Sequence, residues 1–107
     1  MSQFNISWTP FALKCLDDIF EYIRHETKSI EPAQKFTDQI IDRTFQLESF
    51  PFSGQEEPLL SSTGQDARYL IEGNYKIIYQ IEKHDIIITD IFHVKQNPVK
   101  IKKRSKK

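Results

Sequence analysis

Residues 68–82 read Arg-Tyr-Leu-Ile-Glu-Gly-Asn-Tyr-Lys-Ile-Ile-Tyr-Gln-Ile-Glu, and this stretch decides the fold. Branched aliphatic and aromatic residues, which favour strands, lie on both sides of Gly73-Asn74, a typical two-residue turn. The pattern predicts a β-hairpin with strands at residues 68–72 and 75–82. A third strand is predicted at residues 86–94, where Ile-Ile-Ile-Thr-Asp-Ile-Phe-His-Val follows a polar turn.

The first residues predict a short strand that leads into a helix. Apolar and polar side chains alternate in residues 4–8, which is the period of a strand with one apolar face. Thr9 is a good N-cap, and Pro10 suits the first helical position because its missing N–H would be unpaired there. Apolar residues then recur every three or four positions as far as Ile23, so a helix is predicted to begin at Pro10.

A second helix is predicted to begin at Pro32, after residues 27–31 break the first pattern. Its apolar residues recur at helical spacing, and Phe50-Pro51 ends it because the residue before a proline is pushed away from helical angles. Two helices joined by so short a link should lie antiparallel, as a hairpin. Residues 53–66 are polar and contain glycine and proline, which predicts a loop.

The predicted order of elements is therefore β-α-α-β-β-β, an α+β fold. A helical hairpin that packs on one face of a mostly antiparallel four-stranded sheet would bury both apolar faces with short connections. The N-terminal strand must join the later strands, because its backbone groups need hydrogen-bond partners. We expect residues 1–98 to form a single domain, followed by a basic tail at residues 99–107.

Composition narrows the class of protein. The 107 residues leave little room for a second domain, and one cysteine, Cys15, allows no intramolecular disulfide. Cys15 falls on the apolar stripe of the first helix, so it is expected to be a buried small hydrophobe. No signal peptide is recognisable, and no apolar stretch approaches the roughly 20 residues of a membrane-spanning helix. We therefore expect a cytoplasmic protein that has no contact with the membrane.

The net charge of zero conceals a strong asymmetry. Residues 95–107 contain seven basic side chains and no acidic one, whereas the remaining 94 residues carry eight basic and fifteen acidic side chains. An acidic body with a basic end favours contact between that end and a polyanion or an acidic partner. The alternative is a solvated terminus that only aids solubility.

The sequence resembles the RelE/ParE toxins of type II toxin–antitoxin systems. Their central strand pair typically reads as a basic residue, a turn, and then Tyr-Arg-hydrophobic-hydrophobic-Tyr, which residues 68–81 approximate. Residues 86–98 are similar to the final strand of the family and its exit, and residues 6–12 to its passage from strand to helix. Phe50-Pro51, with Gly54, is similar to the exit from the second helix.

The resemblance implies one of two activities. RelE-like members are ribosome-dependent mRNA endoribonucleases that use Arg and Lys on the sheet and a Tyr near the C-terminus, whereas ParE-like members inhibit DNA gyrase without being nucleases. Lys76 stands where the arginine of the Tyr-Arg pair would be, and Gln96 where a phosphate-binding arginine would follow the last strand. No tyrosine follows Tyr79. These departures and the long helical hairpin favour the ParE-like branch.

The resemblance also implies partners. A ParE-like toxin would act on DNA gyrase and be neutralised by a cognate antitoxin, which in this family commonly wraps around the helical hairpin and the sheet edge. Apolar residues without an obvious internal place fit such a partner; they are Leu59, Leu60, Val99 and Ile101. The alternatives are a nuclease that acts on mRNA at the ribosome, and an inactive relative that serves as a binding or autoregulatory module. We expect neither metal nor cofactor, because no His, Cys or Asp spacing predicts a metal site.

Four side chains are candidate functional residues. Arg68, Lys76 and Lys95 are candidates for target binding, and Arg68 could form a cationic patch with Lys76 across the hairpin. In a nuclease these three, with His93, would be the catalytic candidates, since a histidine titrates near neutral pH. Structural roles are the alternative: an ion pair for Arg68, a solvent-facing position for Lys76, and a hydrogen-bonded position among apolar residues for His93.

The tyrosines of the hairpin have two interpretations. Tyr69, Tyr75 and Tyr79 could stack on bases, as aromatic residues on an exposed sheet do in RNA-binding domains. Alternation places Tyr75, Ile77 and Tyr79 on one face of their strand. That arrangement favours a position in the core.

Overall fold

The computed structural model describes residues 3–56 and 67–95. Its elements in chain order are β1 (Asn5–Trp8), α1 (Pro10–Thr27), α2 (Ile30–Thr44), the 3-10 helix η1 (Phe45–Glu48), β2 (Gln55–Glu56), β3 (Ala67–Glu72), β4 (Tyr75–Glu82) and β5 (Asp85–His93). The expected basic tail, Gln96, and the apolar residues Leu59, Leu60, Val99 and Ile101 lie outside the described residues.

The sheet confirms the predicted α+β class and corrects the strand count. Its order is β1-β5-β4-β3-β2, with β1 parallel to β5 and every other pair antiparallel. The sheet has five strands where four are predicted, because Gln55 and Glu56 pair with Tyr69 and Arg68. A two-residue strand is too short to show an alternating pattern, so the sequence indicated only a loop there.

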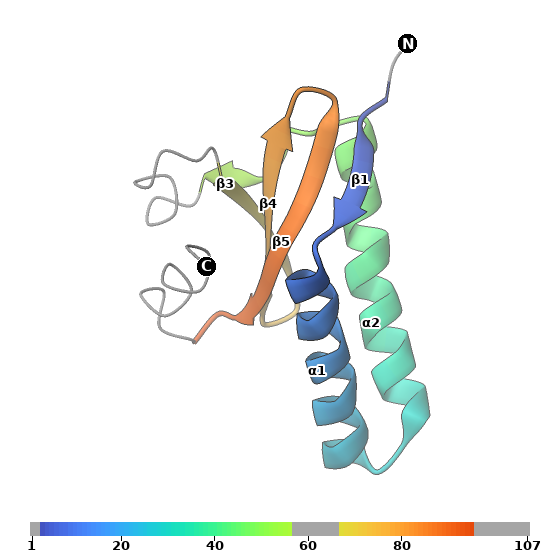
Figure 1. The fold of residues 1–107 in the computed structure, drawn as a ribbon. Coiled ribbons are helices and arrows are strands. Elements are labelled where there is room, and N and C mark those ends of the chain that lie inside the picture. Colours follow the sequence, from blue (N-terminus) through green and yellow to red (C-terminus); the bar gives the residue numbers. More distant parts are fainter. Residues whose placement is uncertain (1–2, 57–66, 96–107) are drawn as a thin grey trace.

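Both helices cover one face of the sheet and run antiparallel, and the tip of the hairpin projects beyond the end of the sheet (Figure 1). α1 begins as predicted, since the Thr9 side chain accepts a hydrogen bond from the Ala12 N–H at 3.0 Å. α2 begins at Ile30, two residues before the predicted start, with Pro32 inside its first turn. A proline is tolerated there because N–H groups of the first turn have no partner within the helix.

The end of the second helix also differs from the prediction. α2 stops at Thr44, and the 3-10 helix η1 continues the chain as far as Glu48. The apolar spacing that predicted one helix up to Phe50 is preserved across this change, because Leu47 is fully buried against the sheet. The spacing of apolar residues indicates which side chains face the core. It does not indicate whether the last turn is α-helical or 3-10.

The main core lies between the helical hairpin and the sheet. Its buried residues are Ala12, Cys15, Ile19, Ile40, Leu47, Leu70, Ile77, Tyr79, Ile86, Ile88 and Ile91. The expected burial of Cys15 and the core positions of Ile77 and Tyr79 are thus confirmed. A register shift opposite Ile78 and Tyr79 changes the phase of β5, so that Ile88 and Ile91, three residues apart, both face the helices.

Candidate functional site

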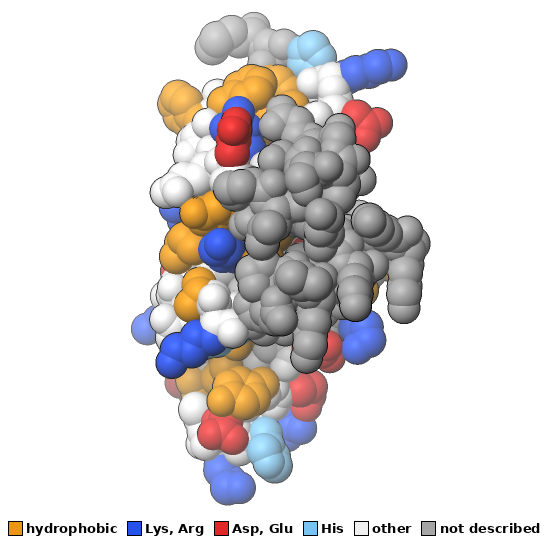
Figure 2. All heavy atoms as spheres, turned by 90° about the vertical axis from the view of Figure 1, so that its left-hand side faces the viewer, with side chains coloured by type: hydrophobic (Ala, Val, Ile, Leu, Met, Phe, Trp, Pro, Cys, Tyr) orange, Lys and Arg blue, Asp and Glu red, His pale blue; other side chains and the backbone are white. Residues whose placement is uncertain are grey.

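Lys76 lies on the face of the sheet that the helices leave open. Its Nζ is 4.3 Å from the centre of the Tyr69 ring and 5.9 Å from that of Phe92. Tyr69 packs there against a small second cluster of buried residues, Ala67, Ile78 and Phe92. Figure 2 views the molecule from this side, where hydrophobic and basic side chains lie next to one another. The arrangement is a half-buried cation held over aromatic rings.

Arg68 lies on the opposite face. It pairs across the hairpin with Tyr79, which belongs to the main core, whereas Lys76 pairs with Ile71. Successive side chains of a strand point to opposite faces, so positions 68 and 71 face opposite ways. The expected cationic patch of Arg68 and Lys76 is therefore wrong. The pairing register, which the sequence does not show, decides this point.

The Arg68 side chain packs against the segment that precedes β2. Its guanidinium carbon is 5.2 Å from the centre of the Phe52 ring, and Nη1 donates a hydrogen bond to the Gly54 carbonyl at 3.1 Å. These contacts join the first residues of β3 to the chain that leaves the second helix. They give Arg68 a structural role in holding this segment.

The hydroxyl of Tyr79 holds the same segment from beneath. It donates to the Pro51 carbonyl at 2.8 Å and accepts from the Gly54 N–H at 2.9 Å, and Tyr79 itself is fully buried. A side chain at position 54 would collide with this hydroxyl and with the Tyr69 carbonyl, so glycine is required. The stacking role considered for Tyr79 is excluded, because a fully buried ring cannot meet a base.

His93 and Tyr75 lie on the helix side, at the end of the sheet near the Gly73-Asn74 turn. Their rings meet edge to face at 5.3 Å, and Phe36 of α2 packs against Tyr75 at 5.7 Å. The His93 Nδ1 accepts the backbone N–H of Lys95 at 3.1 Å. Burial, and to a smaller degree the nearby Tyr22, raise the pKa of the Tyr75 hydroxyl above 10.0.

The four candidate residues do not share one cleft. His93 and Lys95 lie together at the end of β5, Lys76 is on the open face, and Arg68 is near the other end of β3. Phosphodiester cleavage needs a base, an acid and phosphate-binding cations around one phosphate. Among the residues that the structure describes, these four do not form that arrangement. No group of metal-binding side chains occurs within the same part of the chain.

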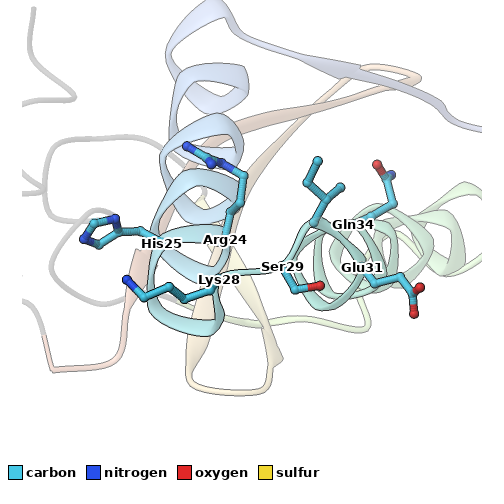
Figure 3. Close-up of a pocket in the computed structure, with 7 residues that line it drawn as sticks. Arg24, His25, Lys28, Ser29, Glu31 and Gln34 are labelled. Carbon is cyan, nitrogen blue, oxygen red and sulfur yellow. The ribbon is translucent and has the colours of Figure 1, made fainter.

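A hollow lies at the tip of the helical hairpin, and no pattern in the sequence indicates it. Figure 3 shows its lining residues, Arg24, His25, Lys28, Ser29, Glu31 and Gln34 among them. The side chains of the α1 end extend to one side, and Glu31 and Gln34 of α2 to the other, so they do not converge on a common point (Figure 3). Arg24 is paired with Glu21 at 2.6 Å.

Comparison with known proteins identifies the family. The family described as the ParE toxin of type II toxin–antitoxin system, parDE, matches residues 6–98. The chain belongs to the ParE toxin family. A solved structure titled "Chromosomal ParDE TA system from P. aeruginosa" has the same fold, with a TM-score of 0.68 and 21% identity over 84% of this chain and 95% of that chain. No curated protein matches the sequence.

Membership of the ParE toxin family confirms the branch that the departures at Lys76 and Gln96 favoured. It also agrees with the fold, in which a long helical hairpin covers one face of the sheet. No helix within the described residues is long and apolar enough to cross a membrane.

Proposed function

We propose that this ParE-family chain is a toxin that arrests growth by binding DNA gyrase, and that a cognate antitoxin neutralises it. The observation that carries the proposal is the distribution of its candidate cations over both faces of the sheet. Such an arrangement favours a protein that acts by binding its target over a protein that cleaves RNA. A gyrase target would place this action in the cytoplasm.

Target binding is assigned to the open face of the sheet. Lys76 presents a charge there beside Tyr69 and Phe92, and a cation over aromatic rings provides both apolar contact and charge to a protein partner. Lys95 follows β5 at the surface and is the second candidate for target binding. Arg68 would contribute indirectly, by fixing the Gly54 segment that leads into the edge strand β2.

Neutralisation by an antitoxin is supported by apolar side chains that the fold leaves exposed. Ile30 is 61% exposed, Phe50 68% and Phe52 60%. We assign contact with the antitoxin to these side chains, at the tip of the helical hairpin and after η1, because such contact would remove their apolar surface from water.

The test is induction of the chain in cells, with and without the product of the adjacent gene, while DNA supercoiling and mRNA integrity are followed together. Relaxed or broken DNA with intact messages is expected, and co-expression of the neighbour should restore growth. Rapid message cleavage with unaffected DNA would instead establish a ribosome-dependent nuclease, for which Arg68, Lys76, His93 and Lys95 are the catalytic candidates. Absence of growth arrest together with binding of the neighbour would indicate an inactive binding module.

A further inference from the structure

An aromatic groove runs between α1 and the end of the sheet near the Gly73-Asn74 turn. A hollow of about 530 Å³ adjoins a second one of about 250 Å³, and the two share Tyr22, Tyr75 and His93. Phe36 completes the wall of the larger hollow, and Asp18 lines the smaller one. We call these five residues, Asp18, Tyr22, Phe36, Tyr75 and His93, the aromatic groove.

Four rings from four different elements form its walls. Tyr75 of β4 contacts both Phe36 of α2 and His93 of β5, at ring-centre distances of 5.7 and 5.3 Å. Tyr22 of α1 is 59% exposed and lies close enough to Tyr75 to affect its ionisation. The apolar side chains of Ile19 and Ile23 also line the two hollows. A ligand here would therefore meet ring faces and edges above an aliphatic floor.

The smaller hollow has an acidic side chain in its lining. Asp18 is the one Asp, Glu, Lys or Arg among the described residues that line the two hollows. The Nζ of Lys14 lies 3.2 Å from the Asp18 carboxylate, and the side chains of Lys14 and Asp18 are 69% and 67% exposed. An exposed pair of this kind contributes little and is screened by salt, so a cation from a partner can compete for the carboxylate.

These features select one type of side chain. Aromatic faces attract a cation through the ring quadrupole, and an aliphatic stem packs on an apolar floor while the charged head remains near water. A planar guanidinium also stacks on a ring and bonds a carboxylate with two parallel N–H groups, which an ammonium cannot do. We propose that the aromatic groove receives an arginine side chain of the antitoxin, a proposal that rests on the neutralisation proposed above.

The first experiment tests the groove without the antitoxin. N-acetylarginine amide and N-acetylcitrulline amide, which has the same shape without the charge, are titrated into the purified chain, and the ring resonances of Tyr22 and Tyr75 are followed by NMR. The arginine compound should bind about 3- to 30-fold more tightly than the citrulline compound. An equal response to both compounds would overturn the proposal.

Variants of Asp18 and Tyr22 test whether the arginine compound binds in the aromatic groove. Asp18→Asn and Tyr22→Leu should each weaken binding of the arginine compound severalfold, whereas Tyr22→Phe, which keeps the ring, should not. Both positions are more than half exposed, so the variants are expected to fold. If replacing Lys102, Lys103 and Arg104 together with Gln strengthens the binding, the chain's own basic segment competes for the groove, which overturns the assignment to a partner.

The second experiment uses the complex with the product of the adjacent gene. Each arginine of that protein is replaced with glutamine, and affinity is measured against the wild-type chain and against Tyr22→Leu. One replacement should weaken the wild-type complex about 3- to 30-fold and have no further effect in the Tyr22→Leu complex. If no arginine of the partner is coupled to Tyr22, the proposed arginine contact in the aromatic groove is overturned and the proposed neutralisation is not. Absence of any complex overturns the proposed neutralisation as well, so the two failures are distinguishable.

Discussion

Removal of the Tyr79 hydroxyl is the most direct test of how the fold fixes the segment before β2. In Tyr79→Phe the Pro51 carbonyl and the Gly54 N–H each lose a partner, and both residues are buried. A buried polar group left unsatisfied costs about 1–3 kcal/mol, so the two groups together should lower the free energy of unfolding by about 2–6 kcal/mol. For a domain of this size the midpoint of thermal unfolding should fall by roughly 10–30 °C.

Urea denaturation followed by circular dichroism measures this change. The midpoint should fall while the dependence of the unfolding free energy on urea stays constant, because the surface exposed on unfolding is nearly unchanged. Tyr69→Phe is the matched control, since its hydroxyl donates at 2.9 Å to the side chain of Gln55 at the surface. The control should lose about 0.5 kcal/mol or less. If Tyr79→Phe is no more destabilising than Tyr69→Phe, the two buried hydrogen bonds do not hold this segment.

Three further predictions concern the turn, the open face and the aromatic groove. Gly73→Ala should destabilise the chain by about 1–2 kcal/mol in urea denaturation. The reason is that Gly73 has a φ of 60° and that a Cβ there would lie 3.0 Å from Phe36. An unchanged midpoint of urea denaturation would contradict this. Lys76→Gln should reduce growth arrest in a viability assay while the unfolding midpoint is retained, whereas Lys83→Gln in the exposed β4–β5 turn should remain toxic, and equal toxicity of the two would remove Lys76 from target binding. The raised pKa of Tyr75 predicts that its contribution to stability is present below pH 10.0 and is lost as the pH rises through the higher pKa of the folded state. A series of unfolding midpoints from pH 8 to 11.5 should therefore fall less steeply for Tyr75→Phe than for the wild type, and identical slopes would exclude Tyr75 as the cause.

Much of the local structure could be predicted because local signals are complete within short windows. The Gly73-Asn74 turn, the three strands around it and the start of α1 at Thr9-Pro10 were all predicted to within one or two residues. Turn and cap residues act on their own neighbours, so these features need no knowledge of distant contacts. β2 was missed for the converse reason, since its two residues form a strand only because β3 lies beside them.

The candidate site divides in the same way. The residue types of the hairpin predicted that Lys76 and Arg68 are candidates for target binding. They did not predict that the two side chains lie on opposite faces of the sheet. The aromatic groove was not predicted, because Asp18, Tyr22, Phe36, Tyr75 and His93 come from separate elements and share no spacing in the sequence.

The sequence by itself thus determined the order of the two long helices and the four longer strands, the α+β class, the burial of Cys15 and the family to which the chain belongs. Periodicity, turn chemistry and caps are properties of neighbouring residues, and they can be read along the chain. Only the tertiary structure decided which face each cation occupies, how the Tyr79 hydroxyl holds the Gly54 segment, and which rings meet in the groove. These depend on strand register and on how the helices pack over the sheet, and a shift of one residue would have reversed every face.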